Sequence, residues 1–94
     1  MTLSELFKDL TEDKHCADRF AVNESGVSCE PNSRRARKWC AMGWVVRKSS
    51  TRVTEAKALT SLREYAKSLG FDGPSTANDT MGYDFIKSIQ ENCK

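Results

Sequence analysis

Residues 3–13 form the first of four stretches in which apolar residues recur at helical spacing. Their apolar positions follow the i, i+3, i+4, i+7 pattern of a single helix face: Leu3, Leu6, Phe7 and Leu10. Thr2 precedes this stretch and Glu5 lies three residues further on, which is a capping-box pattern. The sequence therefore predicts a first helix over residues 3–13.

Residues 34–48 predict a second helix, which Ser33 could cap. Helical spacing is kept by five of its positions: Ala36, Trp39, Cys40, Gly43 and Trp44. A helix that is apolar on almost all sides is expected to be the central, buried one. A glycine inside a helix costs about 1 kcal/mol relative to alanine, so Gly43 is predicted to allow another element to pack closely. We expect both tryptophans to belong to the core.

Two further helices are predicted in the second half of the chain. Residues 54–69 carry an apolar stripe, and Gly70 followed by Phe71 matches a Schellman ending. Residues 81–92 predict a fourth helix, in which Phe85, Ile86 and Ile89 are expected to face inward. The residues just before this last helix are good N-caps: Asn78, Asp79 and Thr80.

Residues 19–22 and 27–29 are two short, partly alternating runs around a turn that ends in Gly26. This pattern predicts a small β-hairpin that must lean on the helices, because two strands alone are only marginally stable. The expected fold class is α+β and mostly α: a compact four-helix domain with one short β-hairpin. Residues 1–94 are expected to form a single small globular domain.

Composition limits the classes of protein to which the chain can belong. Apolar residues make up 38% and charged residues 30% of the chain, which argues against disorder. The longest mainly apolar run, residues 39–46, is less than half of the roughly 20 residues that a membrane span requires. The N-terminal sequence lacks the pattern of a secretory signal, so we expect the protein in the cytoplasm of the cell that makes it.

The net charge of +2 conceals an uneven distribution. Residues 31–53 hold seven bases and no acid: Arg34, Arg35, Arg37, Lys38, Arg47, Lys48 and Arg52. Four of them fall in the predicted first turns of the second helix, where the helix dipole disfavours cations. The functional interpretation is an anion-facing patch. The alternative is charge balance against the acidic first helix.

Signals for nucleic-acid recognition are absent from the sequence apart from this patch. There is no helix-turn-helix pattern, zinc-finger spacing or RNA-binding aromatic motif. The predicted second helix is apolar beyond its first turns, so only its N-terminal end could contact phosphates.

Candidate catalytic and metal-binding residues are few. His15 is the only histidine, and the four cysteines are Cys16, Cys29, Cys40 and Cys93. Their spacing lacks the tight pairs of zinc sites, and without an export signal disulfides are not favoured. We therefore expect free thiols with packing roles, with zinc or disulfides as alternatives. No catalytic residue, metal site or cofactor is predicted.

Three separated pieces of the chain occur in a distinctive order: Phe20-Ala21 with the turn to Gly26, the segment from Trp39 to Trp44, and Asn78-Asp79 ahead of Phe85 and Ile86. Together they resemble a bacterial and phage domain family of unknown function. Family members carry a Trp-Cys-Ala-Leu-Gly-Ala-Leu helix and an Asn-Asp pair that opens the last helix. The resemblance spans roughly residues 15–92, and His15, Trp44 and the basic cluster depart from the pattern. It implies a shared fold and a phage or bacterial source, so that the expected cytoplasm is that of a bacterial host cell. It implies no activity.

These observations favour a non-enzymatic protein-interaction module, of the kind with which phages inhibit a host defence or nucleic-acid-handling protein. Its expected partner is a host protein with an acidic or phosphate-binding surface, bound through the seven bases of residues 31–53, and no membrane is involved. One alternative is direct nucleic-acid binding through the same bases. Another is a small enzyme or thiol switch that uses Cys16 or Cys40 with His15.

Overall fold

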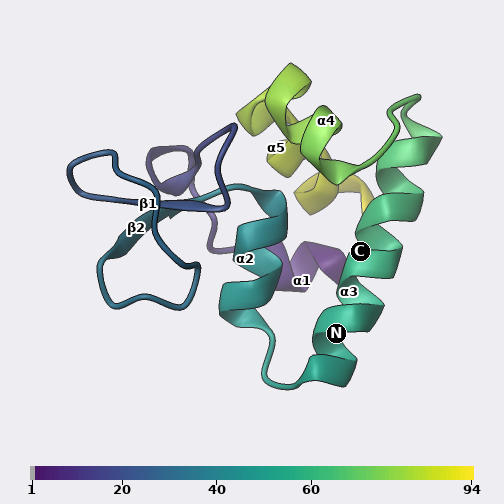
Figure 1. Ribbon diagram of the computed structural model, residues 1–94. Helices are drawn as coiled ribbons and strands as arrows, with labels where there is room; N and C mark the ends of the chain where they lie inside the picture. The colour runs from purple at the N-terminus through teal and green to yellow at the C-terminus, as the bar shows by residue number, and fades with distance from the viewer. Residues whose placement is uncertain (1) are drawn as a thin grey trace.

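A computed structural model describes residues 2–94. The long helices lie to one side of a small sheet (Figure 1). In chain order the elements are α1 (Leu3–Phe7), the 3-10 helix η1 (Glu12–Lys14), β1 (Ala21–Asn23), β2 (Ala36–Trp39), α2 (Ala41–Lys48), α3 (Arg52–Ser68), α4 (Pro74–Met81) and α5 (Tyr83–Asn92). Four helices have eight or more residues, and the two strands are antiparallel. The expected fold class, a mostly helical domain with four helices and one small sheet, is therefore confirmed, although several boundaries differ.

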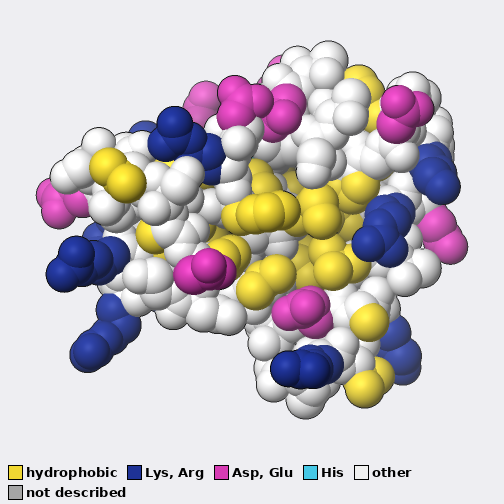
Figure 2. Space-filling view, in the orientation of Figure 1, with side chains coloured by type: hydrophobic (Ala, Val, Ile, Leu, Met, Phe, Trp, Pro, Cys, Tyr) yellow, Lys and Arg dark blue, Asp and Glu magenta, His cyan; other side chains and the backbone are white. Residues whose placement is uncertain are grey.

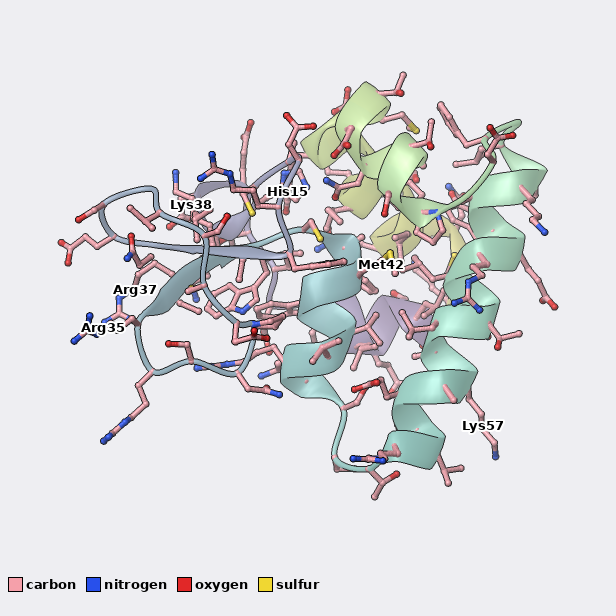
Figure 3. The ribbon with its side chains drawn as sticks, viewed as in Figure 1. His15, Arg35, Arg37, Lys38, Met42 and Lys57 are labelled. Carbon is pink, nitrogen blue, oxygen red and sulfur yellow. The ribbon has the colours of Figure 1, made fainter. Side chains whose placement is uncertain are left out.

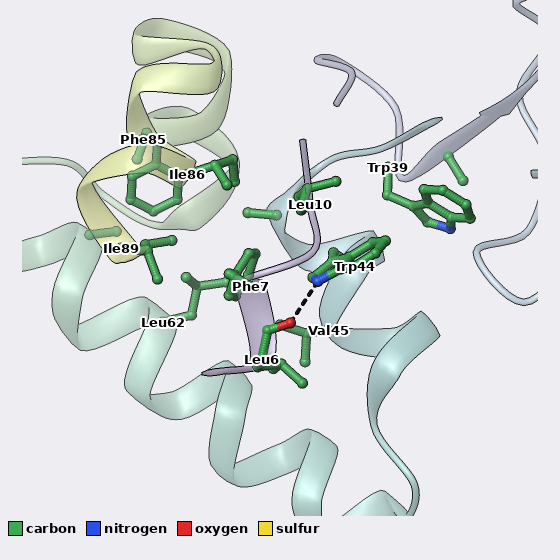
Figure 4. Close-up of a cluster of buried hydrophobic side chains, with 14 of the residues drawn as sticks. Leu6, Phe7, Leu10, Trp39, Trp44, Val45, Leu62, Phe85, Ile86 and Ile89 are labelled. Atoms are coloured by element: carbon green, nitrogen blue, oxygen red, sulfur yellow. Dashed lines mark hydrogen bonds between the residues drawn. The ribbon is translucent and has the colours of Figure 1, made fainter. Parts of the chain in front are cut away.

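The core lies where α1 packs against α2, α3 and α5 (Figure 4). Its largest fully buried side chains include Phe7, Leu62 and Phe85. Trp44, only 4% exposed, donates an indole N–H to the carbonyl of Leu6 at 2.8 Å. Trp39 is 7% exposed and meets Trp44 edge to face, with ring centroids 5.4 Å apart. The prediction that both tryptophans are core residues is confirmed.

The first helix is shorter than the predicted range of residues 3–13. The capping box of Thr2 and Glu5 is present, but α1 ends at Phe7. Side chains of α5 donate hydrogen bonds to carbonyls at and after the end of α1. Gln90 donates to the Phe7 carbonyl at 2.8 Å, and Tyr83 donates to the Leu10 carbonyl at 2.8 Å. The helix can therefore end without leaving these carbonyls unpaired.

The second helix begins seven residues later than the predicted start at residue 34. Residues 36–39 form strand β2, and α2 starts at Ala41 with Cys40 as its N-cap. The Cys40 sulfur accepts a hydrogen bond from the Gly43 N–H, and the side-chain oxygen of Asn78 accepts one from the Ala41 N–H at 3.0 Å. Pairing with β1 and this distant cap outweigh the helical spacing of the apolar residues.

Gly43 allows the close packing that the sequence predicted. A Cβ atom at this position would lie 1.9 Å from the carbonyl oxygen of Phe20. The chain entering β1 therefore lies directly against the first turn of α2, at a distance that only glycine permits.

The predicted β-hairpin is only partly correct. Its second strand was expected in residues 27–29, but the regular partner of β1 is β2, with Ala21 opposite Trp39 and a bulge between Val22 and Asn23. Residues 27–29 still fold back on β1 through an isolated bridge between Val22 and Ser28. The turn was therefore located correctly and the main strand pairing was not.

In the C-terminal half, the predicted third helix is confirmed as α3, whereas two helices, α4 and α5, lie where one was predicted. At the end of α3 the Phe71 N–H bonds the Ala66 carbonyl and the Gly70 N–H bonds the Lys67 carbonyl, which is the predicted Schellman ending. The single helix predicted over residues 81–92 is preceded by another, α4, and Gly82 separates it from α5 with φ of +63°. The three predicted cap residues, Asn78, Asp79 and Thr80, consequently lie inside α4.

Within residues 2–94, no helix has both the length and the apolar character needed to cross a bilayer.

Candidate functional site

A depression lined by basic side chains and two tryptophans lies between β2 and the C-terminal end of α2. Its volume is ≈310 Å³. Four cations line it, Lys14, Arg37, Arg47 and Lys48, together with Ala36, Trp39 and Trp44. None of the described residues that line it is acidic. We call this feature the basic depression.

Arg47 is fixed in the wall of the basic depression by two backbone carbonyls. Its Nη1 atom donates to the carbonyls of Pro31 at 3.2 Å and Ser33 at 2.9 Å. Its guanidinium also lies 5.2 Å from the centroid of the Trp39 ring. Since a guanidinium has five N–H donors, three remain after these two bonds. The Arg47 side chain is therefore already ordered, and it keeps donors for an anion.

Arg37 and Lys48 are positioned in a similar way. The Nη1 atom of Arg37 donates to the carbonyls of Arg34 at 2.9 Å and Ala36 at 3.0 Å. The ammonium of Lys48 lies 5.3 Å from the centroid of the Trp44 ring. Contact with an aromatic face holds a cation by about 0.5–1 kcal/mol at an exposed site. Each of the two tryptophan rings therefore has a cation of the basic depression over its face.

Only three of the seven predicted site residues line the basic depression. Arg37, Arg47 and Lys48 lie together in the basic depression, but Lys38, which follows Arg37 along strand β2, does not line it. In Figure 3 the Lys38 side chain lies apart from that of Arg37. Lys38 is close enough to Cys16 to affect the pKa of its thiol. The other three are exposed, with Arg34 and Arg35 ahead of β2 and Arg52 in the first turn of α3. In Figure 2, basic side chains project around the end of the molecule that the sheet forms.

Lys14 belongs to the basic depression although the sequence analysis did not select it. It ends η1, which lies against β2. In the sequence Lys14 follows Glu12 and Asp13 in the acidic N-terminal segment. Only the packing of η1 on β2 brings it to the other cations, so no local pattern could have revealed it.

The four predicted bases at residues 34–38 are not at a helix N-terminus. They lie in a turn and in β2, so the dipole of α2 does not oppose them. The C-terminal end of α2 instead carries Arg47 and Lys48, where the dipole favours cations. The argument that folding alone would disfavour the basic cluster is therefore wrong for residues 34–38.

A second cluster of polar groups surrounds Asn78, which is only 1% exposed. Its Nδ2 donates to the Cys16 carbonyl at 3.1 Å, and its Oδ1 accepts from the Ala41 N–H. The same oxygen lies 2.7 Å from Nε2 of His15, a contact that requires the proton on Nε2. Asp79 accepts a hydrogen bond from the Asp18 N–H at 2.9 Å. All these hydrogen bonds connect α4 to other segments of the chain, so the cluster stabilises the fold.

The thiols near this cluster are poorly suited to nucleophilic chemistry. Burial raises the pKa of Cys16 from 9.0 to about 11, and burial also raises the pKa of Cys40. His15 is engaged with Asn78. All four cysteines are free, and within residues 2–94 no group of three or more His, Cys, Asp or Glu side chains could hold a metal ion.

We expect Cys16 to react slowly with iodoacetamide at neutral pH. Raising the pKa from 9.0 to about 11 lowers the thiolate fraction by about a hundredfold, and the thiolate is the reactive species. Peptide mapping by mass spectrometry after timed alkylation measures this, with the denatured chain as the control. Modification of folded Cys16 as fast as in the denatured chain would contradict the expectation and favour the thiol-switch alternative.

Comparisons with protein-family models, with curated proteins and with solved structures found no match to this chain. The resemblance to a bacterial and phage domain family therefore stays a prediction, and the argument for function depends on the basic depression.

Proposed function

We propose that this protein is a non-enzymatic protein-interaction module that binds an acidic surface of a partner protein through the basic depression. The observation that carries the proposal is the convergence of Lys14, Arg37, Arg47 and Lys48 on one depression with no described acidic residue in its lining. Complementary charge speeds association and selects partners with an acidic surface. The exposed bases Arg34, Arg35 and Arg52 would extend the contact beyond the depression.

Ordering of the arginines supports a binding role. Arg37 and Arg47 are each held by two backbone carbonyls before any partner arrives. An interface that immobilises a free side chain loses about 0.5–1.5 kcal/mol for each one. Two arginines that are already ordered avoid most of that loss.

The partner class that we propose is a host protein of a bacterium, with this chain acting as a phage-encoded inhibitor of a defence or nucleic-acid-handling machine. This finer proposal depends on the family resemblance of residues 15–92 and on the small size of the chain.

Direct nucleic-acid binding remains the second candidate, because an arginine fork fits a phosphate as well as a carboxylate. Single-stranded nucleic acids also gain affinity by stacking bases on exposed aromatic rings. Trp39 and Trp44 are 7% and 4% exposed, and a cation lies over each ring. Stacking on these two rings is therefore blocked, which favours the protein partner.

We expect the double variant Arg37→Glu with Lys48→Glu to lose the partner in a pull-down from bacterial lysate treated with nuclease. Two negative charges in the basic depression would repel an acidic surface. The control is Lys57→Glu with Arg63→Glu, which makes the same charge change at exposed positions of α3 and should keep the partner. In Figure 3 Lys57 projects from α3, on the side away from Arg37.

Three results would decide between the candidates. Loss of the partner in the depression variant alone supports the proposal. Equal binding by both variants would contradict it. If capture disappears with nuclease in the unchanged protein, the second candidate is favoured, and its affinity for DNA or RNA should then fall linearly with the logarithm of the salt concentration.

A further inference from the structure

We propose that the basic depression is a recognition pocket for the carboxylate side chains of an acidic peptide segment, rich in Asp and Glu, on the partner. This inference rests on the proposed function and specifies its ligand. Lys14, Arg37, Arg47 and Lys48 would hold the carboxylates, and Trp39 and Trp44 would form the floor beneath them.

Guanidinium geometry allows two-point binding of a carboxylate. Arg47 uses Nη1 for the carbonyls of Pro31 and Ser33, and Arg37 uses Nη1 for the carbonyls of Arg34 and Ala36. Each guanidinium retains three N–H donors in a fixed plane, on Nε and Nη2. A planar fork of donors matches the two oxygens of a carboxylate.

The charge of the depression also favours anion binding. Four cations share one depression of ≈310 Å³, and no described residue of its lining is acidic. Mutual repulsion between the cations destabilises the unliganded state, and an acidic ligand relieves it. The Lys14 and Lys48 ammonium groups can follow the ligand, since lysine is a flexible point charge.

The size of the depression suits side chains of a peptide better than a nucleic-acid strand. Ligand pockets measure about 300–1,000 Å³, so this one is at the small end of the range. The neighbouring rings are covered by Arg47 and Lys48 and cannot stack on bases. An acidic peptide requires only carboxylate-sized space and charge, and both are present.

Intrinsic fluorescence offers a direct test, because the two tryptophans of the chain both line the depression. We expect titration with a glutamate-rich peptide with blocked ends to change the tryptophan emission in a saturable manner. A glutamine-rich peptide of the same length should leave the emission unchanged. A single-stranded oligonucleotide should bind more weakly than the acidic peptide at the same salt concentration, and tighter binding of the oligonucleotide would overturn the proposal.

Two variants connect the signal to the pocket. We expect Lys14→Gln and Arg37→Gln each to weaken peptide binding about tenfold, the loss of one charge-assisted contact. Arg47 is left intact because it also fixes the loop around Pro31 and Ser33. Arg63→Gln and Lys57→Gln are the controls, at exposed positions of α3 outside the lining of the depression, and should retain affinity.

The failure of this inference differs from the failure of the proposed function. If the acidic peptide fails to bind, or binds without any effect of Lys14→Gln and Arg37→Gln, the pocket assignment is overturned. A protein partner that is still captured, and lost with the charge-reversed depression, would leave the proposed function in place. Failure of both the peptide titration and the pull-down test would overturn both the pocket assignment and the proposed function.

Discussion

Replacement of Gly43 by alanine is expected to destabilise the domain by about 3 kcal/mol or more, since overpacking of this severity exceeds the usual 1–3 kcal/mol. The new Cβ atom would lie 1.9 Å from the Phe20 carbonyl oxygen. That oxygen is backbone and also accepts a hydrogen bond from the Cys40 N–H, so it cannot move aside without losing a bond. The free energy of unfolding of a 94-residue domain is about 5–14 kcal/mol, so such a loss is a large fraction of it.

Urea denaturation followed by tryptophan fluorescence measures this change. Gly73→Ala is the matched control, because its Cβ atom would have no neighbour within 4 Å and its φ of −177° is open to any residue. The control should lose no more than about 1 kcal/mol, the typical cost of a poorer N-cap. A Gly43→Ala protein as stable as the control would show that α2 and the segment before β1 are not in contact in solution.

The second large effect is expected for Asn78→Ala, which should cost about 3–5 kcal/mol by breaking a buried hydrogen-bond network. The Asn78 amide pairs with the Cys16 carbonyl and the Ala41 N–H, and it also contacts His15. Truncation leaves these groups without that partner in a buried site. It also removes the cap on the first turn of α2.

Thermal unfolding and urea denaturation measure the Asn78→Ala effect, and Asp79→Ala is its control on the same helix. Asp79 is exposed and caps only the Asp18 N–H, so its loss should cost about 1 kcal/mol. If the two variants are equally stable, the buried network contributes little and α2 is capped by Cys40 alone.

Local signals in the sequence determined several features of this fold. The capping box of Thr2 and Glu5 starts α1, and Gly70 with Phe71 ends α3 as expected. These features involve groups within five residues of one another, so local backbone chemistry specifies them. The burial of Phe85, Ile86 and Ile89 was equally predictable, because helical spacing alone places them on one face.

Residues 34–40 show why other features could not be predicted. Their apolar spacing fits a helix, yet residues 36–39 form strand β2, since β1 supplies its strand partner. The N-cap of α2 uses Cys40 and also Asn78, which is far away in the sequence. Helical spacing cannot reveal a competing partner that arrives only when the chain has folded.

The candidate site likewise has some features that the sequence determined and others that depend on the tertiary structure. The sequence by itself determined that residues 31–53 carry seven bases and no acid, that the two tryptophans are core residues, and that Gly43 is a place of close approach. Only the tertiary structure decided that Lys14 joins Arg37, Arg47 and Lys48 in the basic depression and that Lys38 does not line it. Charge and composition are properties of the residues themselves. Which charges converge depends on strand pairing and on the packing of η1 against β2, contacts that connect distant parts of the chain.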